Sequence, residues 1–130
     1  MPQITLEYTS NINQSIDFKK LISDLHQILS EVGGIRIKNC KSRAVCRNNY
    51  FVGDGSSTGA FVHVDLMLVK GRSAEWVEKI GNLVLEKLEA AYSESKDVLD
   101  LQITIHFSDL DRERYFKFPS GTLTPMEEIK

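Results

Sequence analysis

The sequence predicts an α+β fold in which duplicated β-α-β units form one four-stranded sheet with two helices on one face. Three observations predict it. Several segments alternate apolar and polar residues with the period of a half-buried strand. Two longer segments repeat apolar residues at helical spacing. The order strand, helix, strand occurs twice with an offset of roughly sixty residues, which indicates an internal duplication.

The first unit begins directly after Pro2. Residues 3–8 alternate polar and apolar side chains, which predicts a strand with one buried face. After the turn-rich residues 10–15, a helix is predicted by a set of apolar residues at helical spacing: Phe18, Leu21, Ile22, Leu25, Ile28, Leu29 and Val32. Either Ser15 or Asp17 can cap the start of this helix.

The first unit closes with a helix stop and a weaker strand. Gly33 and Gly34 are typical of a helix end, because glycine accepts the left-handed conformation there. A strand is predicted near residues 40–51. Residues 53–59 are glycine-rich but lack the Lys-Ser/Thr ending of a phosphate-binding loop, so we interpret them as a hairpin connection.

The second unit repeats the pattern more strongly. Residues 60–69 predict a strand whose buried face carries Ala60, Val62, Val64, Leu66 and Leu68. Ser73 is a good cap for the following helix, whose apolar stripe is Val77, Ile80, Val84, Leu88 and Ala91. Residues 99–107 form the clearest strand, with a polar face away from the helices: Asp100, Gln102, Thr104 and His106.

The two units predict how the whole chain is organised. We expect residues 1–130 to form a single domain with halves at about 2–52 and 59–107, followed by a tail at 108–130 that has no clean period. Strands joined by a helical crossover are parallel, with a right-handed connection. A ferredoxin-like domain has the same order of elements, so the order alone leaves that fold open.

Composition limits the classes of function. The 130 residues are 42% hydrophobic and 26% charged, with a formal net charge of -2, which predicts a soluble protein and excludes a generally basic nucleic-acid coat. No apolar run approaches the length of a membrane span, and no secretory signal is evident. Cys40 and Cys46 are too few for a disulfide scaffold, so we expect a cytoplasmic protein without membrane or nucleic-acid partners.

Pro2 is the most informative single residue. Removal of the initiator methionine would expose its secondary amine at the start of the first strand. A primary α-amine already titrates at about 7.7–8.0, and burial or nearby cations disfavour the charged form of an amine. Such a group can act as a general base near pH 7. Taken alone, however, Pro2 is better interpreted as a residue with no catalytic role, as at this position in many proteins.

Four motifs stand in order behind Pro2. They are Lys41-Ser42-Arg43-Ala44, Asp54-Gly55, Ala60-Phe61-Val62-His63 and Gly71-Arg72-Ser73. With the duplicated unit, this pattern resembles the tautomerase superfamily, and within it the 5-carboxymethyl-2-hydroxymuconate isomerases most closely. The resemblance extends from Pro2 to about Phe118.

The resemblance implies a homotrimer of the tautomerase/MIF-like fold that acts in aromatic catabolism without cofactor or metal. Pro2 would be the base and then the acid that moves a proton in a dicarboxylate dienol, and Arg72 would bind a substrate carboxylate. Lys41 and Arg43 match a family pair of basic residues, and His63 matches a family position that would line the site. The first of the pair is commonly arginine, and lysine keeps the charge but loses the planar two-pronged grip.

Chemistry supports the same cations independently. An enolising substrate develops negative charge on an oxygen, which cations such as Lys41, Arg43 and Arg72 stabilise. Arg72 also precedes a helix N-terminus, where free N–H groups favour anions. Taken singly, each of these cations can also be interpreted as a solvated surface charge. His63 can be interpreted as a structural or interface residue.

Other readings stay open at this point. Cys40, Cys46 and His63 lack zinc-ligand spacing, and Trp76 is expected to pack near the start of its helix or at a subunit contact. A non-catalytic ligand-binding or regulatory trimer on the same scaffold is the main alternative, because fold likeness is only analogy. A ferredoxin-like RNA-binding or regulatory domain would bind with an affinity that falls steeply with salt.

Overall fold

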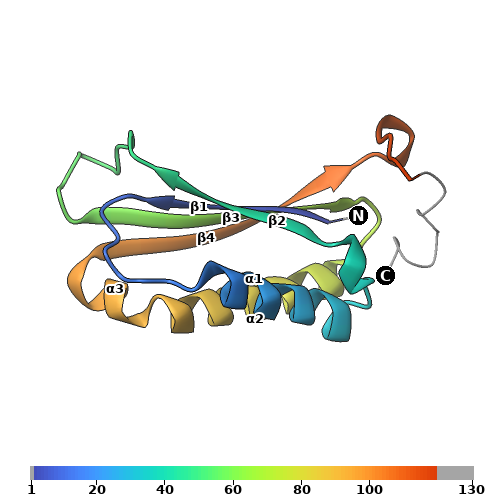
Figure 1. Cartoon of the computed structure of the whole chain (residues 1–130), viewed down its shortest axis with the longest axis horizontal. Coiled ribbons are helices and arrows are strands. Elements are labelled where there is room, and N and C mark those ends of the chain that lie inside the picture. Colours follow the sequence, from blue (N-terminus) through green and yellow to red (C-terminus); the bar gives the residue numbers. More distant parts are fainter. Residues whose placement is uncertain (1, 120–130) are drawn as a thin grey trace.

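Four strands form one mixed sheet in the computed structural model, which describes residues 2–119 (Figure 1). The sheet order is β2-β1-β3-β4, with bounds β1 Gln3–Thr9, β2 Lys41–Arg47, β3 Gly59–Val69 and β4 Asp100–Leu110. β1 pairs with β2 and β3 with β4 in parallel, whereas β1 and β3 are antiparallel. The parallel pairing within each predicted β-α-β unit is therefore confirmed.

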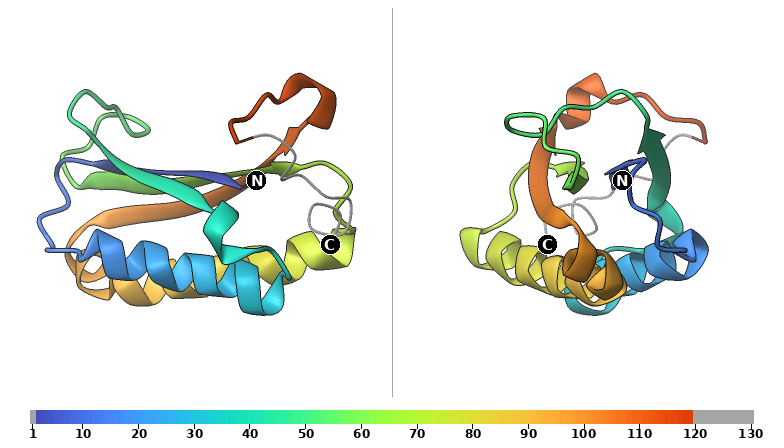
Figure 2. Two further views of the ribbon diagram at one scale, coloured as in Figure 1. Left: turned by 45° about the vertical axis from the view of Figure 1, so that its right-hand side comes forward. Right: turned by 90° about the vertical axis from the view of Figure 1, so that its left-hand side faces the viewer.

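Two long helices lie side by side across one face of the sheet (Figures 1 and 2). α1 spans Phe18–Gln27 and continues as a π-helical turn over Ile28–Val32, and α2 spans Ala74–Ala91. Asp17 caps α1 by accepting a hydrogen bond from the Lys20 N–H at 3.2 Å. Ser73 caps α2 in the same way for Trp76, so the Ser73 prediction is confirmed.

Three short helices were not predicted. α3 spans Ser93–Val98 and joins α2 to β4, and single 3-10 turns cover Ile37–Asn39 and Arg112–Arg114. α3 has no apolar stripe of its own that periodicity can detect, because only Ser95 in it is buried. Its placement depends on contacts with the loop before α1, described below.

The core fills the space between the sheet and the two helices. All five predicted residues of β3, Ala60, Val62, Val64, Leu66 and Leu68, are buried there. They pack with residues of both helices such as Leu25 and Leu88, and with Tyr92. Within residues 2–119 no helix covers the other face of the sheet, which carries mainly polar side chains, including Gln102, Thr104 and His106 as predicted. We call it the open face.

Three expectations about the strands need correction. β2 ends at Arg47 rather than near residue 51, because its partner β1 ends at Thr9. β4 extends to Leu110, since it keeps pairing with β3 as far as Val69. Residues 53–59 do not form a hairpin: β1 lies between β2 and β3, so this segment passes over the end of β1. A hairpin would require β2 and β3 to be neighbours.

The predicted tail is partly structured. Its first residues complete β4 and the turn at Arg112–Arg114, whereas residues 120–130 lie outside the described residues. None of the helices between residues 2 and 119 combines the length and apolar character that crossing a membrane requires.

Candidate functional site

Pro2 lies where the start of β1, the start of β2 and the end of β3 meet (Figure 1). It is buried, and its carbonyl oxygen accepts a hydrogen bond from the Lys41 N–H at 3.1 Å. The β1–β3 register pairs Gln3, the residue after Pro2, with Met67 near the end of β3. The position is therefore a rigid one at the end of an interior strand.

Arg72 lies at the same end of the sheet, on the connection between β3 and α2. It lines a pocket of about 140 Å³ together with Leu68, Val69, Gly71, Val77, Phe107, Ser108 and Asp109. The β1–β3 pairing ends at Gln3 and Met67, and the next residue of β3, Leu68, lines the Arg72 pocket, so Pro2 and Arg72 lie at the same end of the sheet. Gly71 has φ 114°, a conformation that favours glycine and lets the chain turn directly into the helix.

Lys41 and Arg43 occupy alternate positions on the open face of β2. The Lys41 Nζ donates to the Asn39 carbonyl at 3.0 Å. The Arg43 guanidinium donates to the Gln3 side-chain oxygen at 2.7 Å, and the Gln3 amide donates to the Tyr115 hydroxyl at 3.2 Å. Both therefore lie on the open face, Lys41 next to Pro2 through the backbone and Arg43 two residues further along β2.

His63 is not brought to Pro2 within one chain. Its register partner on β1 is Glu7, in the half of that strand away from Pro2. The His63 Nδ1 forms a hydrogen bond with the Thr104 hydroxyl at 2.7 Å on the open face. A role for His63 in substrate binding stays a prediction.

Two further groups that could do chemistry, His26 and Cys40, have pKa values shifted by burial toward their neutral forms. The His26 Nε2 forms a 2.7 Å hydrogen bond with the Ser42 hydroxyl, and burial lowers the pKa of its imidazole. Burial raises the pKa of the Cys40 thiol to about 11, which keeps it protonated. No group of three His, Cys, Asp or Glu side chains in residues 2–119 is arranged to hold a metal ion.

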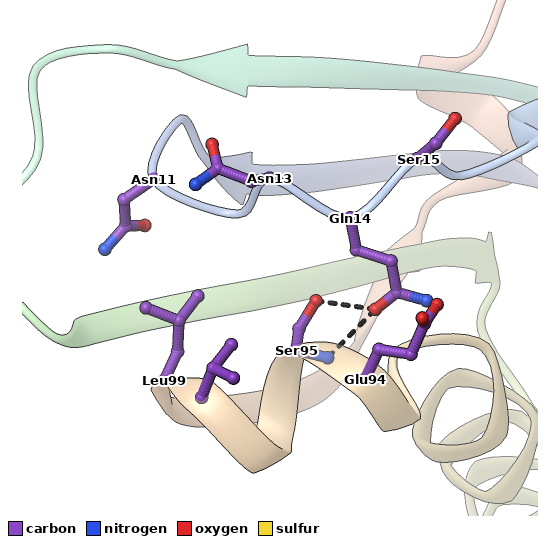
Figure 3. Close-up of a pocket in the computed structure, with 8 residues that line it drawn as sticks. Asn11, Asn13, Gln14, Ser15, Glu94, Ser95 and Leu99 are labelled. Carbon is purple, nitrogen blue, oxygen red and sulfur yellow. Dashed lines mark hydrogen bonds between the residues drawn. The ribbon is translucent and has the colours of Figure 1, made fainter.

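Another pocket lies at the opposite end of the sheet and contains none of the predicted site residues (Figure 3). It has a volume of about 510 Å³ and lies between the loop before α1 and α3. The Gln14 side-chain oxygen accepts hydrogen bonds from the backbone N–H and the hydroxyl of Ser95, at 3.0 and 2.6 Å (Figure 3). The Gln14 amide donates to the Ala91 carbonyl at 2.8 Å. These polar groups hold α3 in place, so we assign them a structural role.

Sequence reasoning missed two residues that contact the predicted cations, Gln3 and Trp76, and a third, Tyr115, that contacts Gln3. Gln3 accepts from Arg43 and donates to Tyr115, and Trp76 lies under Arg72, with the guanidinium carbon 4.6 Å from the ring centroid. The Gln3–Arg43 contact follows from the parallel register of β1 and β2, which no local pattern reveals. The spacing of Arg72 and Trp76, four residues apart at a helix start, was a signal that could have been used.

Comparison with known proteins places the chain in a protein family. A profile of the 5-carboxymethyl-2-hydroxymuconate isomerase family matches residues 2–120. The chain is 25% identical over 126 residues to the 5-carboxymethyl-2-hydroxymuconate Delta-isomerase of Escherichia coli, covering 90% of this chain and 100% of that protein.

Solved structures show the same fold. A 5-carboxymethyl-2-hydroxymuconate isomerase from Deinococcus radiodurans R1 superposes with a TM-score of 0.81 at 24% identity, covering 89% of this chain and 87% of that one. A macrophage migration inhibitory factor-like protein from Entamoeba histolytica has a TM-score of 0.62 at 18% identity, covering 89% and 94%. The predicted tautomerase/MIF-like fold is therefore confirmed.

Proposed function

The chain belongs to the 5-carboxymethyl-2-hydroxymuconate isomerase family and is therefore an isomerase, and we propose that it moves a proton between carbons of a 2-hydroxymuconate-type dicarboxylate. The observation that carries this proposal is the placement of Pro2. It is buried directly before β1, at the end of the sheet where the Arg72 pocket also lies.

Pro2 acts first as the base and then as the acid. Its amine, once it is the first residue of the chain, takes a proton from the dienol or its keto form and returns that proton at another carbon. The substrate gains and loses one proton, so the reaction needs no external oxidant or reductant. Burial and nearby cations favour the neutral amine that this step requires.

The cations bind the substrate and stabilise the developing oxyanion. Arg72 holds one carboxylate from the β3–α2 connection, where the start of α2 adds free N–H groups. Lys41 and Arg43 supply positive charge from β2 for the second carboxylate or the oxo group. Arg43 lies on the open face, so we propose that a second copy in a homotrimer completes this part of the site.

The test is turnover of a 2-hydroxymuconate analogue by protein with a proline N-terminus verified by intact mass. We expect Pro2→Ala to lower kcat by about 10²–10⁴-fold, the usual contribution of a positioned general base. Protein that retains the initiator methionine should be equally impaired, because Pro2 is then an amide without a basic nitrogen.

The matched control is Lys79→Gln, which removes an exposed cation on α2 and should leave turnover unchanged. Equal rates for Pro2→Ala and the parent protein would remove Pro2 from the mechanism. The family membership would then stand with a different base.

A further inference from the structure

A serine and a histidine that the proposed mechanism does not use meet along one edge of the sheet. His26 is in the last turn of α1 and Ser42 is in β2, and these two elements lie at the same edge of the molecule (Figure 2). The His26 Nε2 and the Ser42 hydroxyl oxygen are hydrogen-bonded at 2.7 Å. A hydroxyl this close to an imidazole is the arrangement in which a histidine activates a serine as a nucleophile.

Both residues line a pocket of about 440 Å³ between α1 and β2. Four apolar residues contribute to its wall: Phe18, Ile22, Ile37 and Ala44. Its cationic lining residues are Lys19 and Arg43, and none of the described residues that line it is an aspartate or glutamate. The pocket therefore suits an apolar group joined to a part that develops negative charge.

The imidazole is suited to act as a base at neutral pH. Burial lowers the pKa of His26 below the ordinary value of about 6.5, so the neutral ring dominates there. When Nε2 of the neutral ring accepts the hydrogen bond, it is placed to take the Ser42 proton as the oxygen attacks. A helix and a strand carry the two side chains, so the fold rather than a loop sets their separation.

The edge of β2 supplies a donor for the oxyanion that forms when a carbonyl is attacked. The Lys41 N–H bonds to Pro2 and the Arg47 carbonyl accepts from Ser10, so the odd-numbered residues of β2 turn their peptide groups toward β1. Peptide groups alternate along a strand, and β2 is the outermost strand of the sheet in residues 2–119. The Ser42 N–H therefore points out of the sheet. A nucleophile's own N–H is one of the donors that acyl-transfer sites use.

We propose that Ser42 and His26 form a second catalytic site, which hydrolyses carboxylic esters with a short apolar acyl group and a phenolic leaving group. The apolar wall receives the acyl group, and Lys19 and Arg43 favour the phenolate that leaves. The inference is independent of the isomerase reaction, because it uses neither Pro2 nor Arg72.

The reaction proceeds in two steps. The Ser42 oxygen bonds to the acyl carbon while its proton passes to the His26 Nε2, and the bond from that carbon to the phenolic oxygen breaks. His26 then gives the proton to the departing oxygen. In the second step His26 takes a proton from a water molecule that attacks the acyl carbon, the bond to Ser42 breaks, and the proton returns to the Ser42 oxygen. The sum consumes one ester and one water and releases the acid and the phenol.

The experiment uses the full chain and p-nitrophenyl acetate. We expect a burst of p-nitrophenol, with an acetyl group found by mass spectrometry on the peptide that contains Ser42. Ser42→Ala and His26→Gln should each lower the rate above the uncatalysed reaction by about 10²-fold or more, the usual contribution of a positioned base. Ser30→Ala makes the same change on the turn after α1 and is the matched control, with an unchanged rate.

A further variant separates chemistry from packing. Ser42→Cys keeps a nucleophile of similar size beside His26, so it should still be acetylated and show a burst. If Ser42 only ties β2 to α1, Ser42→Ala would lower the melting temperature and leave acetylation as it is in the parent protein. That result would overturn the proposal.

The pH profile of acetylation identifies the base. With His26 as the base, the rate should rise with a midpoint below about pH 6.5 and stay level above it. A midpoint at about 7.7–8.0 would report an α-amine instead, and acetyl groups found only on lysines or the N-terminus would have the same meaning. Either result rejects the second site. The isomerase proposal would stand in both cases, because turnover of the 2-hydroxymuconate analogue is measured separately.

Discussion

At the scale of single residues, position on the sheet decides what each group can do. Lys41 and Arg43 lie on one face of the same strand, yet the Lys41 backbone bonds to Pro2 and its Nζ to Asn39, whereas the Arg43 guanidinium bonds to Gln3. His63 is bonded to Thr104 rather than directed at Pro2. The sequence identifies these residues, but the strand register determines which side chains lie next to them.

His26 offers a residue-scale prediction of pH dependence. Burial lowers the pKa of its imidazole in the folded chain, so the unfolded chain, with a pKa of about 6.5, binds the proton more readily. The stability that His26 contributes is therefore complete above pH 6.5 or so and declines as the pH falls below it. Thermal unfolding of the parent protein and His26→Gln should show the parent losing its advantage between about pH 7.5 and 5.5.

The comparison with His26→Gln cancels the contributions of His63 and His106, which both proteins share. Melting temperatures that change in parallel across this pH range would contradict the expected effect of burial on His26.

At the scale of elements, the end of the first helix shows how local and long-range terms combine. The predicted stop at Gly33 and Gly34 is confirmed, and Gly34 has the left-handed φ of 75° that glycine tolerates best. The π-helical turn before it was not predicted. The Gly33 N–H donates to Ile28 at 3.1 Å, and the Gly33 carbonyl receives Trp76 from α2. The helix end is therefore shaped partly by the second unit.

Two glycine-to-alanine changes make an element-scale prediction with opposite signs. A Cβ at Gly33 would lie 2.6 Å from the Leu29 carbonyl oxygen and 3.0 Å from the Trp76 ring, so we expect Gly33→Ala to cost about 1–3 kcal/mol. A Cβ at Gly81, within α2, would meet Phe107 at an ordinary 3.4 Å. Gly81→Ala should stabilise the helix by about 0.5–1 kcal/mol.

Urea unfolding followed by circular dichroism measures both changes. Each variant serves as the control for the other, because both replace a glycine by alanine. If Gly33→Ala were as stable as the parent protein, the close approach of Leu29 and Trp76 would be wrong.

At the scale of the whole molecule, the sheet has one covered and one open face (Figure 2). The open face is polar and already paired in places: Arg47 bonds to Glu7 at 2.7 Å, and His106 to Asp65 at 3.2 Å. A sheet face without helices is commonly buried by symmetry mates. The homotrimer implied by the resemblance would use this face, with polar rather than purely apolar contacts.

We therefore predict a mass of three chains of 14.7 kDa by size exclusion with light scattering. Val45→Glu adds a charge to the open face of β2 and should weaken the assembly. Val98→Glu, on the exposed side of α3, is the matched control and should leave it intact. A parent protein that elutes as a monomer at micromolar concentration would contradict this architecture.

The sequence by itself determined the two β-α-β units, the buried stripe of β3, the cap at Ser73 and the helix stop at Gly33. These follow from local periodicity and backbone preference, which act within a few residues. The family resemblance also came from motifs along the chain. Tertiary structure alone decided the sheet order, and with it the crossing of residues 53–59 over β1, because strand neighbours depend on pairing between distant segments.

The candidate site divides in the same way. Pro2 and Arg72 were predicted as residues, but their shared end of the sheet depends on the antiparallel pairing of β1 with β3. Trp76 under Arg72 and Gln3 beside Arg43 emerged only from the packed structure. Such contacts join side chains from separate elements, and their geometry is set by the whole core rather than by any short stretch of chain.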